Sequence, residues 1–487
     1  MTAQATAMAE PATAARRRAL PLWTGAVIYA ALLLAGNRLL NDPDTFWQIR
    51  IGQWIIDNRA LPHADAFSFT VHGQPWISTQ WLAQVLYATA FNLAGWPGPV
   101  VLAASAIALA FALLAGFLIR RLDDVPAIAL LSAAFAIAAG HLLARPHALA
   151  LPVMVVWMGV LLSAAERRTS PSLPWIALIV LWTNLHGSFL FGLVVIAPVA
   201  LDALVNAAPA ARKTLAVRWA AFALAALAAS MVTPYGWHSL LAARNILSLG
   251  AALPLIGEWA PADFSTFGAL EAGVMALLGF ALVTRAKCPP VRIVLFLGLL
   301  HMALSHVRNA DVFALLAPMV LAAPLAQYVT GQGASRLVLR SSVPMIAVAV
   351  ALMGAATAAA VSFAPYAPAA TTAPAAAVAA LRQHRAARVF NDYDFGGYLI
   401  WQGMPTFIDG RTELFGETLM VRHDRATSLK QVDALIDLLD RYQIDATLLR
   451  SSTPAVHLLD RLDGWRRVYA DGVAVVHVRS PGAPAKK

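Results

Sequence analysis

The sequence has little cysteine and little charge, and each shortage excludes a class of protein. Cys288 is the single cysteine among 487 residues, which rules out an internal disulfide and a zinc site built on cysteines. Charged residues make up only 13% of the chain, too few for an ordinary soluble or disordered protein. The phosphate-binding patterns G-x-G-x-x-G and G-x-x-x-x-G-K-[ST] are absent as well, so an enzyme that uses a nucleotide is not expected.

Apolar residues are present in excess. They account for 59% of the chain, and the mean hydropathy is +0.65. Runs of about 17 to 25 apolar residues can cross a bilayer as helices, because a helix satisfies its own backbone hydrogen bonds. The sequence therefore predicts a polytopic α-helical membrane protein with about eleven transmembrane helices. These are expected near residues 21–40, 97–119, 125–140, 147–165, 173–185, 188–206, 218–233, 267–284, 289–305, 311–328 and 343–361.

The composition changes near Ser362. Residues 1–361 carry 21 basic and 13 acidic side chains, whereas the much shorter remainder carries 15 and 13. Prolines in the Ala/Pro/Thr stretch that follows remove backbone donors, which predicts a linker without regular structure. The expected organisation is an N-terminal cytoplasmic tail (1–20), a transmembrane domain (21–361), a linker (362–380) and a small mixed α/β domain (381–487).

Short alternating segments and turn residues predict the elements of that last domain. Asp471-Gly472 is a good hairpin turn between its last two strands. A helix capped by Thr427 or Ser428 is expected to end near Tyr442. Strands are expected at 387–390, 405–408, 446–449, 466–469 and 473–478.

The basic residues predict the orientation in the membrane, because short cytoplasmic loops retain Lys and Arg. Fifteen basic residues fall on one face of the predicted transmembrane domain and six on the other. An N-terminus inside and eleven crossings place the α/β domain outside, in the periplasm of a bacterial inner membrane. The net charge of +10 is thus an orientation signal, and nucleic acid is not an expected partner. The fifteen residues are Arg16, Arg17, Arg18, Arg120, Arg121, Arg167, Arg168, Arg212, Lys213, Arg218, Arg285, Lys287, Arg292, Arg336 and Arg340.

Residues 41–96 form a long exterior loop rich in Trp. Its segment 45–58 has apolar residues on one side and polar residues on the other, as in an amphipathic helix lying in the headgroup zone. A second such helix is expected from Trp81 onward. Trp and Tyr favour the membrane interface, which supports helices parallel to the membrane.

The loop opens with Asp42-Pro43-Asp44, two carboxylates just after a predicted transmembrane helix. Asp before Pro is also the usual start of a helix, so Asp42 is equally well explained as a cap. A carboxylate at this boundary can take the proton of an acceptor hydroxyl, and an Asp-x-Asp pair can instead hold a divalent metal such as Mg²⁺ or Mn²⁺. Both roles stay open for Asp42 and Asp44.

The order of features in this loop resembles the GT-C superfamily of membrane glycosyltransferases. The loop has an acidic Pro-Asp, an amphipathic helix, a Gly-x-Pro-aromatic turn (residues 73–76) and a Trp/Leu/Tyr-rich helix. Members such as lipid A aminoarabinose transferases and protein O-mannosyltransferases use polyprenyl-phosphate-linked sugars. The resemblance implies that Asp44 is the catalytic base or a metal ligand. Signatures of the type DPDTFW, RPH, NLHG, HVRN and FIDGR are more similar to an uncharacterised bacterial branch.

One departure limits what can be transferred from those relatives. Aminoarabinose transferases carry charged residues after the Gly-x-Pro turn, where this chain has Ile77-Ser78-Thr79-Gln80. Their substrate is therefore not assigned to this protein.

Polar residues near the outer ends of the predicted helices supply the rest of the candidate site. A lipid-phosphate donor needs cations there, and arginine matches phosphate oxygens in a two-pronged geometry. Arg145 and Arg308 are the expected phosphate-binding residues, helped by His147 and His306. The alternative is that both arginines contact headgroups or pair with Glu258 or Asp311. The expected substrate-binding residues are Asn184, His186, Glu258, Trp259, Asp394, Asp409 and Arg411.

Simpler structural roles stay open for several of these residues. The segment 184–187 can be a tight turn, and Asp409 with Arg411 can be a local ion pair. The leading hypothesis is transfer of a sugar from a polyprenyl-phosphate donor to a lipid, glycan or protein acceptor on the periplasmic face. Membrane lipids are the other expected partners. The alternative is a non-catalytic transporter or scaffold for lipid-linked glycans.

Overall fold

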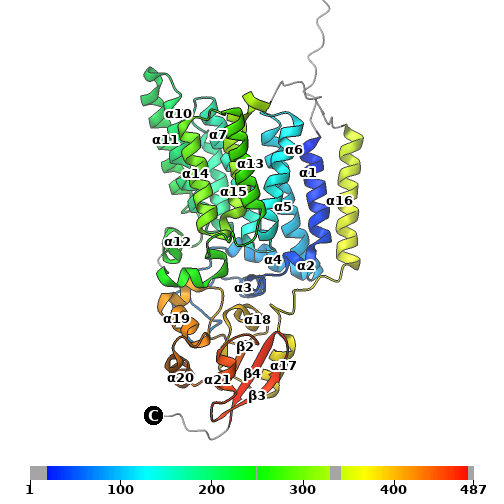
Figure 1. The fold of residues 1–487 in the computed structure, drawn as a ribbon, viewed down its shortest axis with the longest axis vertical. Coiled ribbons are helices and arrows are strands. Elements are labelled where there is room, and N and C mark those ends of the chain that lie inside the picture. Colours follow the sequence, from blue (N-terminus) through cyan, green and yellow to red (C-terminus); the bar gives the residue numbers. More distant parts are fainter. Residues whose placement is uncertain (1–18, 248, 330–341, 481–487) are drawn as a thin grey trace, which may run out of the picture.

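The computed structural model describes residues 19–247, 249–329 and 342–480. Figure 1 shows a bundle of roughly parallel helices with a smaller α/β region packed against one of its ends. The predicted cytoplasmic tail lies almost wholly outside the described residues, as do five residues of the orientation count. Those five are Arg16, Arg17, Arg18, Arg336 and Arg340.

Each predicted apolar run overlaps a helix or a broken pair of helices in the bundle. Within the described residues, five helical segments are long and apolar enough to cross a membrane, and five more apolar segments are shorter. The number of crossings therefore stays a prediction. The bundle helices are α1 (Leu20–Leu34), α5 (Pro97–Leu118), α6 (Asp124–Ala138), α7 (Pro146–Glu166), α8 (Ala177–Leu185), α9 (Phe189–Val194), α10 (Ile196–Val205), α11 (Pro209–Ala229), α13 (Ala269–Thr284), α14 (Pro290–Ser305), α15 (Ala310–Val329) and α16 (Val343–Phe363).

Proline begins many of these helices. Pro97, Pro146, Pro209 and Pro290 each occupy the first position of a helix. The missing backbone N–H costs nothing there, because the first turn has no acceptor for it. These prolines therefore mark the boundary between each loop and the helix that follows it. The boundary at Pro146 restricts the backbone conformation of the residue before it, and with it the direction of that residue's side chain.

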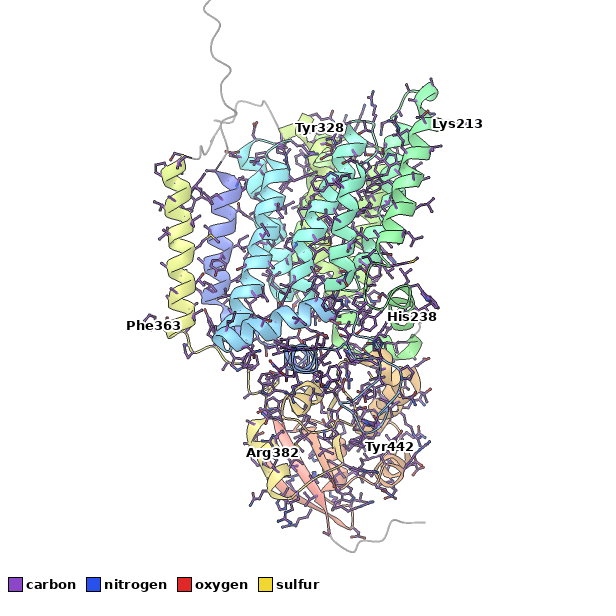
Figure 2. The ribbon with its side chains drawn as sticks, turned by 180° about the vertical axis from the view of Figure 1, so that it is seen from behind. Lys213, His238, Tyr328, Phe363, Arg382 and Tyr442 are labelled. Carbon is purple, nitrogen blue, oxygen red and sulfur yellow. The ribbon has the colours of Figure 1, made fainter. Side chains whose placement is uncertain are left out.

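Helices α3 (Asp44–Asn58) and α4 (Trp81–Ala94) of the first loop lie across the end of the bundle, as Figures 1 and 2 show. The expected amphipathic helix thus begins one residue earlier than predicted. The two helices touch closely at Gly52, where a Cβ atom would lie 2.0 Å from the carbonyl oxygen of Gln84. Gln48 joins them further by side-chain hydrogen bonds of 2.8 Å to Gln80 and Gln84.

The α/β region contains a four-stranded sheet in the order β1-β2-β4-β3. Strands β1 and β2 pair in parallel, and the other two pairs are antiparallel. The hairpin predicted at Asp471-Gly472 joins β3 to β4. The elements are α17 (Ala375–Gln383), β1 (Val389–Asn391), α18 (Gly396–Trp401), α19 (Thr412–Thr427), α20 (Val432–Arg441), β2 (Ala446–Arg450), α21 (Ala455–Leu459), β3 (Trp465–Ala470) and β4 (Ala474–Arg479).

Three sequence predictions for this part of the chain were wrong in detail. Residues 405–408 form no strand, and Thr406 makes isolated bridges to Ser68 and Val389. Thr427 ends α19 and does not cap the next helix, which begins only at Val432. The expected linker is helical from Ala375 onward, because three alanines follow the last proline.

The α/β region packs directly on α3. A Cβ atom at Gly397 would lie 2.2 Å from the carbonyl oxygen of Pro43, so only glycine allows this contact. Beside it, the ring of Phe46 packs edge-on against Tyr398 and Trp96, with centroids 5.1 and 5.4 Å apart. This contact places the loop between β1 and α19 over the start of α3.

Candidate functional site

The segment Asp42-Pro43-Asp44 sits at the junction of the bundle, α3 and the α/β region. Asp42 is 3% exposed, and its Oδ1 accepts a hydrogen bond of 2.8 Å from the backbone N–H of Asp44. Its Oδ2 accepts one of 3.0 Å from Arg145 Nη1. The residue at the N-cap of α3 is Pro43 and not Asp42, but the Asp42 carboxylate still stabilises the start of α3 and also holds an arginine in place.

Asp44 is the first residue of α3, and its side chain lines a cavity. Trp47 Nε1 donates a hydrogen bond of 2.8 Å to its Oδ1. Gly410 of the α/β region packs against the same oxygen, since a Cβ atom at Gly410 would lie 2.0 Å from Asp44 Oδ1. Burial and then repulsion by Asp42 raise the pKa of Asp44 to about 8. A carboxyl with such a pKa can exchange a proton near neutral pH.

Two arginines face this carboxyl across a shared glutamate. Glu258 lies in a short 3₁₀ turn (Gly257–Trp259), and both Arg145 and Arg308 pair with it. The distance from Arg308 Nη1 to Glu258 Oε1 is 2.8 Å. Although burial favours the protonated form, Arg145 and Arg308 lower the pKa of Glu258 to about 2. The guanidinium of Arg308 also stacks 4.5 Å above the ring of Trp259.

The backbone around Arg145 is held by the first loop. Arg145 is extended and stands just before Pro146, outside α7. Tyr87 donates a hydrogen bond of 3.0 Å to the carbonyl oxygen of Arg145, and Thr45 donates one of 3.1 Å to that of Ala144. Helices α3 and α4 therefore fix the direction in which the guanidinium points.

The three predicted histidines of the site have different surroundings. His147 Nε2 lies 2.5 Å from Asp311 Oδ2, and its ring centroid lies 5.0 Å from that of His186. His306 Nδ1 lies 2.8 Å from the carbonyl oxygen of Trp259. His306 thus contacts the backbone of Trp259 and does not line the cavity. It therefore does not lie beside the phosphate site, where the sequence predicted it.

Two adjoining hollows of about 100 and 210 Å³ make up the cavity. They share Arg145, His147, Glu258 and Arg308. The structure thus brings together seven of the thirteen predicted site residues from five separate parts of the chain. The seven that line the cavity are Asp44, Arg145, His147, His186, Glu258, Trp259 and Arg308.

The other predicted residues lie next to the cavity or away from it. Asn184 lines a separate groove and accepts a hydrogen bond of 2.8 Å from Trp81 Nε1. Asp394 pairs with Arg450 at 2.5 Å. Asp409 and Arg411 are fully buried in an ion pair of 2.7 Å, so the local ion pair is what the structure shows for them.

The buried pair of Asp409 and Arg411 has a third member that the sequence did not reveal. Arg411 Nη1 also lies 2.5 Å from Asp65 Oδ1, and all three side chains are inaccessible to solvent. Asp65 belongs to the first loop, 346 positions earlier in the chain. This buried triad joins the loop to the α/β region and holds Gly410, which stands between two of its members, against Asp44.

Glu413 is a second residue that the sequence analysis missed. It lines the cavity with Thr412, and burial raises its pKa. Trp76 Nε1 donates a hydrogen bond of 3.2 Å to its Oε1. A possible signal was the Gly-Arg-Thr-Glu sequence after residue 409, where an acid follows a turn at the start of a helix.

Metal binding by Asp42 and Asp44 stays a prediction that the local geometry does not favour. Both oxygens of Asp42 already accept hydrogen bonds, one of them from a cation. Among the described residues, no group of three or more His, Cys, Asp or Glu side chains is arranged to hold a metal. These residues do not fit a divalent ion, so we derive no step through one.

No family model matches this chain, and no curated protein matches it by sequence. Solved structures do match it. The crystal structure of the Archaeoglobus fulgidus oligosaccharyltransferase in the apo form aligns with a TM-score of 0.53 at 13% identity, covering 88% of this chain and 69% of that one. The archaeal oligosaccharyltransferase AglB from Archaeoglobus fulgidus, in complex with an inhibitory peptide and a dolichol-phosphate, aligns with a TM-score of 0.51 at 12% identity. That alignment covers 95% of this chain and 75% of that one. At these identities the likeness concerns the fold, and this chain shares the overall fold of these oligosaccharyltransferases.

Proposed function

We propose that this protein is a glycosyltransferase of the GT-C type. It moves a sugar from a polyprenyl-phosphate donor to a lipid, glycan or protein acceptor at the membrane surface nearest the α/β region. The observation that carries the proposal is the convergence of Asp44, Arg145 and Arg308 on one cavity at that surface. The fold shared with AglB supports the same class of reaction.

Asp44 acts as the general base in this proposal. The acceptor hydroxyl gives its proton to the Asp44 carboxylate while its oxygen attacks the anomeric carbon of the sugar. The bond from that carbon to the phosphate oxygen breaks on the opposite side, which inverts the configuration. The polyprenyl phosphate leaves with the bonding electron pair. The hydrogen bond from Trp47 keeps the carboxyl pointing into the cavity.

Arg145 and Arg308 hold the phosphate and stabilise the charge that develops on it as the bond breaks. Both guanidiniums are already oriented, because Glu258 pairs with each of them. An incoming phosphate then shares the two arginines with Glu258. The stacking of Arg308 on Trp259 limits the positions that its side chain can adopt.

The fold comparison supports the proposed acceptor, and the distribution of basic residues supports the proposed location. AglB was solved with an inhibitory peptide and a dolichol-phosphate, which supports a lipid-linked donor and a protein acceptor in general terms for this chain. We place the cavity and the α/β region in the periplasm of a bacterial inner membrane. Figure 2 shows Lys213 at the end of the bundle away from that region, as the distribution of basic residues requires.

Transfer in membranes that contain an Asp44→Asn variant tests the proposal. We expect transfer to fall by about 100-fold or more, because general-base catalysis contributes about that much. Asp57→Asn is the matched control, since Asp57 lies on the exposed side of the same helix. Full activity of the Asp44 variant at equal expression would refute the role of this residue.

A second variant separates catalysis from binding alone. Arg308→Ala should weaken use of the donor and raise its KM, because it removes one guanidinium from the phosphate site. An unchanged affinity for the donor would show that Arg308 is structural. Donor binding without transfer, in the wild-type protein, would favour the transporter or scaffold alternative.

A further inference from the structure

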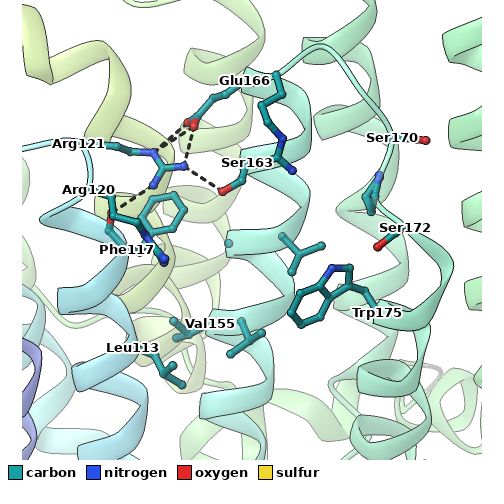
Figure 3. Close-up of a pocket in the computed structure, with 15 residues that line it drawn as sticks. Leu113, Phe117, Arg120, Arg121, Val155, Ser163, Glu166, Ser170, Ser172 and Trp175 are labelled. Atoms are coloured by element: carbon teal, nitrogen blue, oxygen red, sulfur yellow. Dashed lines mark hydrogen bonds and ion pairs between the residues drawn. The ribbon is translucent and has the colours of Figure 1, made fainter. Parts of the chain in front are cut away.

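A larger cavity lies at the opposite end of the bundle. It measures about 720 Å³ and opens between α5, α7 and the 3₁₀ turn that precedes α8 (Leu173–Ile176), as Figure 3 shows. Along α7 the lining of this cavity begins at Val155, ten positions or about 15 Å from Arg145 at the rise of an α-helix, and continues to the far end of the helix. The cavity is therefore separate from the site at Asp44.

The inner part of this cavity is apolar. Leu113 and Phe117 of α5 form one side, and Val155 and Gly159 of α7 form the floor. Leu113 lies seven positions before Arg120, so the apolar wall extends about 10 Å from the charged end of α5 toward the middle of the bundle. Figure 3 shows Trp175 across the cavity from Leu113. Water alone is a poor occupant of such a surface.

The rim of the cavity carries more positive than negative charge. Arg121 pairs with Glu166 at 2.6 Å and stacks 3.6 Å from the centroid of the Phe117 ring. Glu166 also lies 3.6 Å from Arg292, so the negative charge of Glu166 is compensated. Arg120 and Arg167 are exposed at the same rim.

Arg120 and Arg167 differ from Arg121 in having no counter-charge. Within the part of the chain that the structure describes, neither side chain makes an ion pair or a hydrogen bond. Two uncompensated guanidiniums thus stand at the mouth of a cavity whose inner wall is apolar. An anionic headgroup joined to hydrocarbon matches both parts of this surface.

We propose that this cavity binds one anionic glycerophospholipid from the leaflet on that side of the membrane. Its phosphate lies between Arg120 and Arg167, and an acyl chain follows the wall formed by Leu113 and Val155. Trp175, which is 42% exposed, lies across the cavity from Leu113 and lines the opposite side of the acyl-chain path. The general excess of Lys and Arg in cytoplasmic loops requires no apolar cavity beneath them, so it does not account for this arrangement.

Native mass spectrometry of the purified full chain in detergent tests the proposal. Dioleoyl phosphatidylglycerol and dioleoyl phosphatidylcholine are titrated separately, since they share acyl chains and differ in net charge. We expect a saturable single-lipid adduct with phosphatidylglycerol and at least tenfold weaker binding of phosphatidylcholine. The double variant Arg120→Gln/Arg167→Gln should weaken phosphatidylglycerol binding about 30-fold, from the usual contribution of two basic residues to anionic-lipid attraction.

The matched control is Lys213→Gln/Arg218→Gln, which removes two exposed positive charges from α11 at the same end of the bundle. This control should bind phosphatidylglycerol as the wild type does. A Gly159→Leu variant keeps every charge and adds a side chain against Phe117, whose ring a Cβ at this position already meets at 3.4 Å, so it should narrow the cavity and also lose the adduct.

Three results would overturn the proposal. One is equal binding of the two lipids, and another is an equal loss in the Lys213/Arg218 control. The third is an adduct with undecaprenyl phosphate under conditions where phosphatidylglycerol gives none, which would make the ligand a polyprenyl phosphate. If Gly159→Leu does not fold, the two charge variants still decide the outcome.

Discussion

The raised pKa of Asp44 predicts that this residue destabilises the folded protein at neutral and alkaline pH. The unfolded chain loses the Asp44 proton near pH 3.8, whereas the folded protein keeps it until about pH 8. Between these values the folded state binds more protons than the unfolded state, so the free energy of unfolding falls as pH rises. Asp44→Asn removes this titration and keeps an oxygen that can accept the hydrogen bond from Trp47.

The size of the effect follows from the two pKa values. They differ by about 4 pH units, and each unit corresponds to about 1.4 kcal/mol, which gives at most about 6 kcal/mol above pH 8. The stability advantage of Asp44→Asn over the wild type should therefore be small at pH 4. It should grow by up to about 1.4 kcal/mol per pH unit and level off above pH 8.

Thermal unfolding in detergent, followed by tryptophan fluorescence from pH 4 to 9, measures this difference. Asp57→Asn is the control on the same helix and should show a difference that does not vary with pH. A constant difference between Asp44→Asn and the wild type across this range would refute the reasoning. It would mean that Asp44 is ionised in the folded protein near its ordinary pKa.

Three further predictions concern the surroundings of Asp44. Asp42→Asn removes the negative charge next to Asp44, so it should lower the pKa of the Asp44 carboxyl by about one pH unit. The rising limb of a plot of kcat/KM against pH reports the base of the free enzyme and should shift to lower pH by that amount; an upward shift or none would contradict this. Arg411→Gln leaves two buried carboxylates unpaired and should lower the free energy of unfolding by about 3 to 5 kcal/mol, whereas Arg422→Gln in an exposed pair should cost less than about 1 kcal/mol in the same denaturation assay. Gly410→Ala should reduce transfer because its Cβ meets Asp44 Oδ1, while Gly472→Ala, which has open space around it, should not; equal activities of the two variants would count against the contact.

The sequence predicted the parts of the site that carry charge near the ends of apolar runs. A charge in that position is costly unless it has a partner or a cavity, so Arg145, Glu258 and Arg308 were identifiable without a structure. The pairing of the arginines with Glu258 was an open alternative, and the structure has this pairing. Which arginine approaches Asp42 depends on how α3 and α4 hold residue 145, and no local pattern encodes that contact.

The contributions of the α/β region were harder to predict. Asp65 and Arg411 meet across 346 positions, and neither segment alone suggests the other. Glu413 lies on α19, whose helical pattern is interrupted at Gly416, where φ is +70°. Asp409 and Arg411 were expected to contact substrate, but they point into the protein and leave the glycine between them to form the wall of the cavity.

Both arginines of the cavity are paired with carboxylates before any substrate enters. Asp42 and Glu258 offset Arg145 and Arg308, and Asp44 is mostly protonated at pH 7 because its pKa is about 8. A phosphate must therefore compete with Glu258 for both guanidiniums. On the proposed mechanism this competition weakens binding of free phosphate, and the lipid chain of the donor has to supply much of the affinity. The same added negative charge favours the protonated form of Asp44, so transfer draws on the minor fraction of the protein in which Asp44 has already given its proton to water, and that carboxylate then takes the proton of the acceptor hydroxyl.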